Sequence, residues 1–333
     1  MGVTLHPVRA AAPDMAASVA EAKPAHGQPG MEDGVVTDDL TAGPLSLDDI
    51  PALLALFHRY DRRYFGEPLM DADDLHSDLS VPDLDLAADT LGLRTLDGTL
   101  VAGGFVTPRG HLEAQFAEGW DTPELAARLV DFGENRARQR GLDSVFYFVA
   151  EGDTERAAWL RGRGYRLAYT AWILRLDLDT PIRGRELPSG YAVRPFTPDD
   201  AEAAFVVIRN AFAEWDTAPD TSFESWRARM LDRPHADPTA FRVATYQDEV
   251  IGAAIVFDSA DEAWVAQLAV ARPHRGRGVA QQLLADAYAA ARSRGVPHAG
   301  LATDTRTGAL DLYQRLGMRV LFTLHNYNLP LSG

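Results

Sequence analysis

The sequence predicts two tandem α/β (α+β) domains in a chain of 333 residues. Predicted strands and helices follow the same order in both halves, at a spacing of about 150 residues. A segment that contains both Pro and Gly, 179–190, separates the halves. The apolar fraction of 46% supplies enough side chains for a core in each half.

The first domain is expected to span 41–178, after a tail, 1–40, that is rich in Ala, Pro, Asp and Gly. The tail lacks a periodic apolar pattern, which is typical of disorder, and Met31 is an alternative start of the chain. Acidic caps and apolar residues at helical spacing predict a helix from Ile50. The other expected elements are helices at 73–79, 122–140 and 154–161 and strands at 90–95, 100–106, 111–116, 144–149 and 165–176.

The second domain is expected to span 191–329 and to repeat this order. Capping residues predict helices after Asp200 and after Thr221, and Asp248 lies in a predicted hairpin turn. The remaining expected elements are helices from 279 and at 307–316 and strands at 191–195, 241–246, 250–257, 264–270, 299–303 and 318–327.

A basic turn with two glycines lies between the strand 264–270 and the helix that starts at Val279. Gly276 and Gly278 permit backbone angles at which successive N–H groups converge on one point, and the helix adds free N–H groups and the positive end of its dipole. Three arginines, a local exception in a chain of net charge −16, surround this point: Arg272, Arg275 and Arg277. The turn therefore predicts a site for a phosphate or diphosphate, with a solvated arginine-rich surface turn as the alternative.

The segment Arg275-Gly276-Arg277-Gly278-Val279-Ala280 resembles the Q/R-x-x-G-x-G/A signature of the GCN5-related N-acetyltransferase (GNAT) superfamily. A second segment, 308–318, resembles the next helix of that family, with Tyr313 four residues before a glycine. The resemblance implies that each domain is a mixed, mostly antiparallel twisted sheet flanked by helices, and that acetyl-CoA is a co-substrate. The residues that it assigns to acetyl-CoA are Leu268, Ala269, Val270, Arg275, Gly276, Arg277, Gly278, Val279 and Ala280.

The resemblance also implies catalytic roles. A backbone N–H near Leu268 to Val270 would polarise the thioester carbonyl, and Tyr313 would act as the general acid that returns a proton to the CoA thiolate. A core-facing helical tyrosine is the alternative for Tyr313, which lies on an apolar stripe. Glu214 and Asp216 are the candidate bases, because their loop borders the acceptor cleft in the family; an ordinary solvated carboxylate is the alternative for each. Thr305 and Arg306 stand where the family often has an asparagine that holds the cofactor.

The first half lacks these features. Its corresponding loop, 117–124, is acidic and contains no arginine, and Pro123 removes a backbone donor at the helix start. Leu160 stands at the place of Tyr313. We therefore expect the first domain not to bind acetyl-CoA, and to be structural or to supply one wall of the substrate cleft.

Composition excludes several other classes of function. The absence of cysteine excludes disulfides, zinc–cysteine sites and thiol catalysis and suits a cytoplasmic protein. No apolar run approaches the roughly 20 residues that span a bilayer, so no membrane association is expected. The acidic net charge argues against nucleic-acid binding, and the histidine spacings predict no metal site. The expected partner is a small-molecule amine, and the expected state is a monomer or homodimer.

The predicted function is transfer of an acetyl group from acetyl-CoA to a primary amine of a small molecule by the second domain. The two-domain architecture resembles that of the mycothiol synthases, and an antibiotic-inactivating acetyltransferase is a further alternative. From another class of function, a non-catalytic acyl-CoA-binding regulatory module remains an alternative, in which Tyr313 is structural.

Overall fold

The computed structural model describes residues 39–81, 83–179, 182–214, 222–232 and 236–331. Met31 and nearly all of the expected tail lie outside this range. Contacts divide the described chain into two units. The N-terminal unit contains 39–148, 153–166 and 327–331, and the C-terminal unit contains 149–152 and 167–326.

Two strands explain why each unit combines separate stretches of the chain. β6 (Arg166–Asp177) ends the first half of the sequence, but it pairs antiparallel with β11 (His298–Asp304) of the second half. β12 (Arg319–Pro330) is followed by Leu331 of the N-terminal unit, whose N–H donates to the carbonyl of Asp143 at 2.8 Å. The expected domain bounds, 41–178 and 191–329, stay a prediction, since the contacts follow these strands and not a single cut in the chain.

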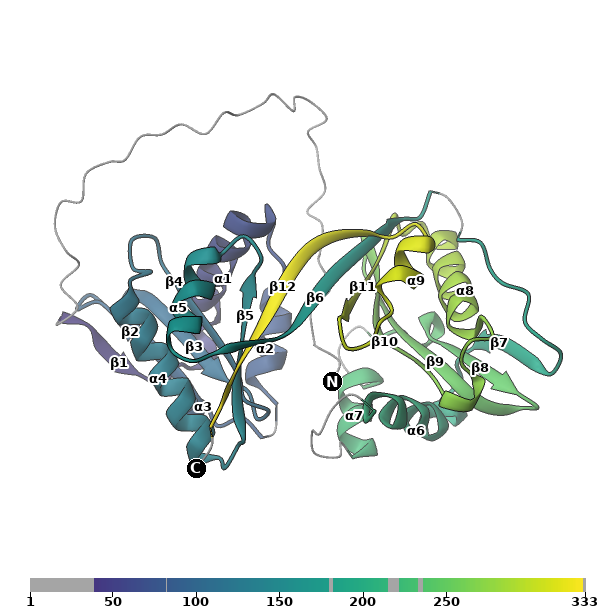
Figure 1. The fold of residues 1–333 in the computed structure, drawn as a ribbon, viewed down its shortest axis with the longest axis horizontal. Coiled ribbons are helices and arrows are strands. Elements are labelled where there is room, and N and C mark those ends of the chain that lie inside the picture. Colours follow the sequence, from purple (N-terminus) through teal and green to yellow (C-terminus); the bar gives the residue numbers. More distant parts are fainter. Residues whose placement is uncertain (1–38, 82, 180–181, 215–221, 233–235, 332–333) are drawn as a thin grey trace, which may run out of the picture. The chain divides into compact units, whose positions relative to one another are not determined.

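The N-terminal unit has a mixed sheet whose strands lie in the order β1-β2-β3-β4-β5. Only the β4–β5 pair among these is parallel. Helices α1 and α4 both pack against β3 and β4 (Figure 1). The elements are β1 (Thr41–Gly43), α1 (Ile50–Phe65), α2 (Ala72–Leu79), α3 (Leu86–Asp89), β2 (Thr90–Arg94), β3 (Leu100–Val106), β4 (His111–Phe116), α4 (Pro123–Gln139), β5 (Ser144–Ala150) and α5 (Thr154–Gly162).

The C-terminal unit has the strand order β6-β11-β10-β9-β8-β7, in which the β10–β11 pair is parallel. Helices α6 and α8 pack against β9 and β10, and their apolar faces join one buried core. Figure 1 shows the strands between α6 and α8. The remaining elements are β7 (Tyr191–Pro195), α6 (Ala201–Phe212), α7 (Phe223–Met230), β8 (Arg242–Tyr246), β9 (Glu249–Asp258), β10 (Glu262–Val270), α8 (Val279–Ser293) and α9 (Leu310–Arg315).

The predicted fold class, mixed sheets flanked by helices, is confirmed, and the local boundaries have identifiable causes. The β8–β9 turn contains Gln247 and Asp248 with φ of 50° and 70°, as in a tight two-residue hairpin. Helix α9 begins at Leu310, later than the expected 307. Gly308 has a φ of 62°, outside the helical region, and the Thr307 hydroxyl accepts from the Ala309 N–H at 3.2 Å, so these residues form a turn instead.

Candidate active site

The site begins where two parallel strands of the C-terminal unit separate. The pairing of β10 with β11 ends at Val265 and Leu301, although β10 continues to Val270 and β11 to Asp304. The register of β10 against β9 shifts just after Val265, which is a β-bulge. A bulge bends a strand and increases its twist, so it directs the end of β10 away from β11 and opens a gap between them.

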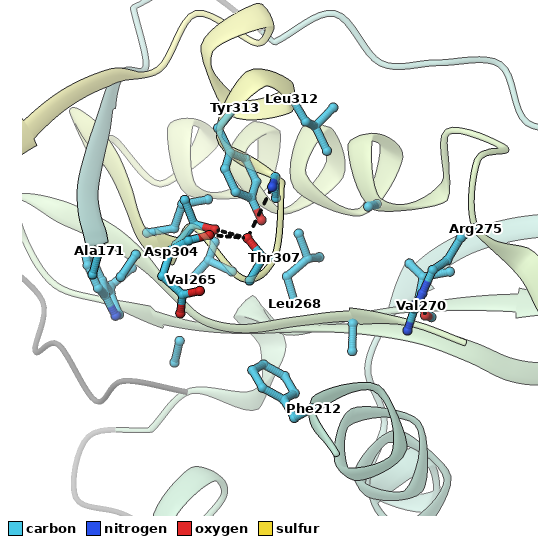
Figure 2. A pocket seen from close by; sticks show the side chains of 18 residues that line it. Ala171, Phe212, Val265, Leu268, Val270, Arg275, Asp304, Thr307, Leu312 and Tyr313 are labelled. Carbon is cyan, nitrogen blue, oxygen red and sulfur yellow. Dashed lines mark hydrogen bonds between the residues drawn. The ribbon is translucent and has the colours of Figure 1, made fainter. Parts of the chain in front are cut away.

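A cavity of about 300 Å³ occupies this gap. Figure 2 shows Phe212 on one side of the strands and Leu312 and Tyr313 on the other, so the lining comes from both faces of the sheet. The cavity is lined by Ala171, Phe212, Trp264, Val265, Ala266, Leu268, Ala269, Val270, Arg275, Ala280, Leu301, Ala302, Thr303, Asp304, Thr307, Ala309, Leu312 and Tyr313. The structure therefore brings together the predicted strand residues, Tyr313 and two residues of the predicted anion site.

Tyr313 extends from α9 toward the cavity (Figure 2). The side chain is buried, with 8% of its surface exposed, and within the described chain its hydroxyl forms no hydrogen bond. Burial raises the pKa of Tyr313 to about 12. The hydroxyl is therefore protonated at neutral pH, and it can donate to a group that enters the cavity.

The predicted anion-binding turn adopts the backbone that its glycines permit. A short 3₁₀ turn, Arg272–His274, follows β10. Gly276 and Gly278 then have φ of 75° and 84°, and α8 begins directly after Gly278. Because the first N–H groups of a helix have no intrahelical acceptor, the turn presents donors at the positive end of α8. Gly276 and Arg277 are exposed, so an anion can reach this point from solvent.

Contacts to neighbouring strands hold the turn in place. His274 Nδ1 lies 2.9 Å from the Tyr191 hydroxyl, and its ring packs against Tyr246 at 5.3 Å between centroids. The Arg277 guanidinium donates to the carbonyls of Pro273 and Arg275 at 2.6 and 3.2 Å. These contacts fix the loop before any ligand is bound, which lowers the entropic cost of binding.

Glu214, a candidate base, contacts Arg275, a candidate phosphate ligand. The Arg275 guanidinium donates to both carboxylate oxygens of Glu214 at 2.8 and 2.9 Å, and its Nε donates to the Val270 carbonyl at 2.8 Å. The hydrogen bonds from Arg275 hold the pKa of Glu214 below its usual value. A carboxylate of this kind is a weak base, so the geometry favours a role for Glu214 in orienting Arg275. Asp216, the other candidate, lies outside the described residues.

Several lining residues were not predicted from the sequence. Asp304 lies at the end of β11, and its carboxylate accepts from Arg306 Nη2 at 2.6 Å. The hydroxyls of Thr303 and Thr307 are 2.7 Å apart and fix the turn that leads to α9. A carboxylate directly after a predicted strand was the available signal for Asp304. Phe212 gave no such signal, because an apolar residue on a helix is ordinarily read as core.

The corresponding place in the N-terminal unit is filled by side chains. The parallel pairing of β4 and β5 ends at Leu112 and Tyr147. The buried Tyr147 hydroxyl donates to the Ala114 carbonyl at 2.9 Å and accepts from Arg156 Nη1 at 3.0 Å. Arg156 Nη2 also donates to Asp121 at 2.8 Å. Tyr147 thus occupies the Ala114 carbonyl, a backbone acceptor that a ligand could otherwise use, and the charge of Arg156 is paired with Asp121.

Two further searches of the described residues concern other classes of site. None of the described helices combines the length and apolar character that crossing a membrane requires. The same part of the chain contains no group of three or more His, Cys, Asp or Glu side chains placed to hold a metal ion.

Comparisons with known proteins agree with this geometry. Residues 203–318 match the Acetyltransferase (GNAT) family. A mycothiol acetyltransferase of Thermobispora bispora is 31% identical over 180 residues, which cover 50% of this chain and 60% of the relative. A GCN5-related N-acetyltransferase from Sphaerobacter thermophilus has a similar structure, with a TM-score of 0.76, 26% identity and coverage of 89% of this chain and 97% of that chain.

A tandem GNAT protein from the clavulanic acid biosynthesis pathway shares the fold, with a TM-score of 0.64, 17% identity and coverage of 88% and 99% of the two chains. Residues 203–318 thus form a domain of the GNAT family of acetyltransferases, and the chain resembles tandem GNAT proteins in fold and a mycothiol acetyltransferase in sequence.

Proposed function

We propose that the C-terminal unit transfers an acetyl group from acetyl-CoA to the primary amine of a small molecule. The observation that carries this proposal is the cavity between β10 and β11, which extends from Arg275 and Ala280, beside the glycine turn, to Tyr313. One continuous space thus joins an anion-binding turn to a hydroxyl donor. Acetyl-CoA combines a diphosphate with a thioester at the end of a flexible arm, and this arrangement suits it. A cytoplasmic location fits a chain without cysteines.

The end of β10 supplies backbone groups for the acyl arm. The pairing with β11 stops at Val265, so Leu268, Ala269 and Val270 line the cavity with an edge that β11 does not cover. The amide groups of the arm can pair with this edge as an added strand would. An N–H of the same edge then donates to the thioester oxygen and stabilises the negative charge that develops there.

Tyr313 acts on the departing sulfur. As the amine nitrogen bonds to the acetyl carbon, the carbon–sulfur bond breaks, the nitrogen releases its proton and the sulfur accepts one. A thiol has an ordinary pKa of about 8.5, well below the value of about 12 for Tyr313. Full proton transfer from Tyr313 is therefore uphill, and its main contribution is a hydrogen bond that stabilises the thiolate as it forms.

Asp304 replaces Glu214 as the candidate carboxylate on the acceptor side. It lines the cavity, whereas Glu214 is not among the lining residues and is held by Arg275. A carboxylate at the cavity wall attracts the cationic form of an amine and can receive its proton directly or through water. Arg306, which pairs with Asp304, limits how much of this charge the acceptor meets.

The first acceptor to test is the unacetylated precursor of mycothiol, because the Thermobispora bispora relative is a mycothiol acetyltransferase. The alternative acceptors are amine-bearing antibiotics and other small amines. Acceptor contacts come from loops that vary within a fold family, so the shared fold does not choose among them.

Release of the CoA thiol tests the proposal directly. The chain has no cysteine, so a thiol-reactive dye reports only the CoA product when the acceptor has no thiol. For the mycothiol precursor, which carries a thiol, loss of the thioester absorbance of acetyl-CoA is followed instead. The parent protein and Tyr313→Phe are compared over a panel of amines, with acetyl-CoA binding measured by calorimetry. We expect turnover by the parent, and reduced turnover with retained binding in the variant. Binding without turnover of any amine would instead favour a regulatory acyl-CoA-binding module, and absence of binding would refute the proposal.

A further inference from the structure

The segment between the two halves lies against the start of α8. The Arg185 N–H donates to Gln282 Oε1 at 2.9 Å, and Gln281 Nε2 donates to the Arg183 carbonyl at 2.9 Å. Gly184 approaches so closely that a Cβ there would lie 2.7 Å from Gln282 Oε1. Two consecutive glutamines of α8 therefore hold the backbone of 183–185 beside the glycine turn.

Arg185 crosses directly over Gly278. A Cβ at position 278 would lie 2.4 Å from Arg185 Cδ and 3.0 Å from its Cγ, closer than real Cβ contacts allow. Gly278 therefore satisfies two separate requirements, the left-handed φ of 84° and the passage of this side chain. The packing places the charged end of Arg185 at the edge of the anion-binding turn.

Arg185 also differs from Arg275 and Arg277 in its contacts. Arg275 is held by Glu214 and the Val270 carbonyl, and Arg277 donates to two carbonyls of the loop. Arg185 is exposed and forms no ion pair with the described residues. Its guanidinium thus remains available for an anion that reaches the start of α8.

We propose that Arg185 binds a phosphate group of acyl-CoA, so that the segment between the halves completes the cofactor site of the C-terminal unit. The inference rests on the proposed function, because it takes acyl-CoA as the ligand. CoA offers two sources of the same chemistry, the diphosphate and the phosphate on its ribose. Arginine suits both, because its planar guanidinium can donate two parallel hydrogen bonds to phosphate oxygens.

The test measures the Kd for CoA in Arg185→Gln by calorimetry. We expect an increase of about 10- to 100-fold, the effect of losing a hydrogen bond to a charged group, and a weaker dependence of affinity on salt. Arg292→Gln is the matched control, because it removes the same charge from an exposed position in the last turn of the same helix. The control should bind as the parent does.

Dephospho-CoA, which lacks the ribose phosphate, identifies the group that is bound. If Arg185 contacts the ribose phosphate, the variant and the parent bind dephospho-CoA equally; if it contacts the diphosphate, the variant loses affinity for both ligands. Either result supports the proposal. An unchanged Kd for CoA in the variant overturns the proposal. Tighter binding also overturns it, because Arg185 would then block access of CoA to the turn instead of binding its phosphate.

Gln282→Ala provides a second route, since it removes the acceptor that holds the Arg185 backbone. We expect weaker CoA binding in this variant, and little further loss when Arg185→Gln is added, because both changes act through one contact. Fully additive losses would contradict this. If the parent itself fails to bind CoA, the proposed function falls together with the inference, whereas a failure at Arg185 alone leaves the proposed function intact.

Discussion

The gap between β10 and β11 and the gap between β4 and β5 show how one topology gives two outcomes. In each unit the parallel pair separates, at Val265 and Leu301 in one and at Leu112 and Tyr147 in the other. The first gap opens into a cavity of about 300 Å³. In the second, the Tyr147 hydroxyl donates to the Ala114 carbonyl and accepts from Arg156. The parallel strands separate in both units, and we expect the side chains at the edge of each gap to decide whether a ligand can enter.

The difference extends to the start of the following helix. α8 begins after Gly278, with the donors of an exposed glycine turn. α4 begins at Pro123 after the cap Thr122, whose hydroxyl accepts from the Leu125 N–H at 3.3 Å. The first N–H groups of α8 can donate to a ligand. In α4, the Leu125 N–H donates to the Thr122 hydroxyl, and Pro123 has no N–H to donate. The comparison predicts one CoA per chain, and two per chain by calorimetry would break it.

The largest expected effect comes from the paired tyrosines. Tyr313→Phe should lower kcat by about a thousandfold, the upper end of the range for loss of a hydrogen-bond donor to a developing anion, while CoA binding changes little. Tyr147→Phe should leave kcat unchanged and reduce the free energy of unfolding by about 1–3 kcal/mol, because the Ala114 carbonyl and Arg156 each lose a buried partner. Steady-state rates and denaturant unfolding of both variants test this. If Tyr313→Phe and Tyr147→Phe lowered kcat equally, the assignment of catalysis to the gap between β10 and β11 alone would be wrong.

The rate should also show how the tyrosine is used. Tyr313 has a pKa of about 12, so its hydroxyl loses its proton only in strongly alkaline solution. We expect no fall of kcat from this group below roughly pH 11, one unit under that pKa. Any alkaline limb at lower pH should therefore persist in the residual activity of Tyr313→Phe. If this alkaline limb disappeared in the variant, Tyr313 would have a lower pKa than about 12, and its hydroxyl would be more exposed to water than the structure shows.

The paired glycines should give the next effect. Gly278→Val forces a left-handed φ of 84° on a branched residue and sets its Cβ against Arg185. We expect the Kd for CoA to rise by about a hundredfold, because strain and displacement of the turn together cost roughly 3 kcal/mol. Gly119→Val is the matched control, with a φ of 79° and open space around the position of its Cβ. The control should lose stability but bind CoA as the parent does.

Arg156→Met tests whether the closed gap is structural. Arg156 contacts Asp121 and Asp153 and lies over the rings of Tyr60 and Phe116. Removing it leaves the buried Asp153 without this partner, so the free energy of unfolding should fall by about 3 kcal/mol. CoA stoichiometry should remain one per chain, because the acidic loop before α4 still lacks an anion site. A second bound CoA in this variant would show that Arg156 alone closes the gap.

The sequence predicted the features that depend on neighbouring residues. The glycine turn, the strand before it and the helix after it form one continuous segment. Their patterns predicted the fold, which is confirmed, and the anion site, which stays a prediction. The pairing of Glu214 with Arg275 was not visible, because it joins residues 61 positions apart. The same holds for Arg156 and Tyr147, and for Arg185 over Gly278. Each depends on how separate elements pack, and a motif does not record this.

The bulge in β10 illustrates a subtler limit. A short apolar run predicts that 264–270 is a strand, but a bulge adds one residue without changing composition. The bulge directs the end of β10 away from β11, so the sequence located the strand without revealing how its end is turned. For the same reason Asp304 and Phe212 appeared as an ordinary strand end and an ordinary core residue.

The smallest expected effect concerns Glu214 and its pair with Arg275. Glu214→Gln should raise the KM for acetyl-CoA a few-fold and leave kcat nearly unchanged, since an exposed pair contributes little and we propose Asp304, not Glu214, as the carboxylate that receives the proton. Arg275 lowers the pKa of Glu214, so the pair is intact above the ordinary carboxylate pKa and is lost only as pH falls through the lowered value. The difference in KM between parent and variant should therefore shrink only in acid. A large loss of kcat at neutral pH in Glu214→Gln would instead restore Glu214 as the base, and the two gaps would then differ by a catalytic carboxylate as well as by the space they enclose.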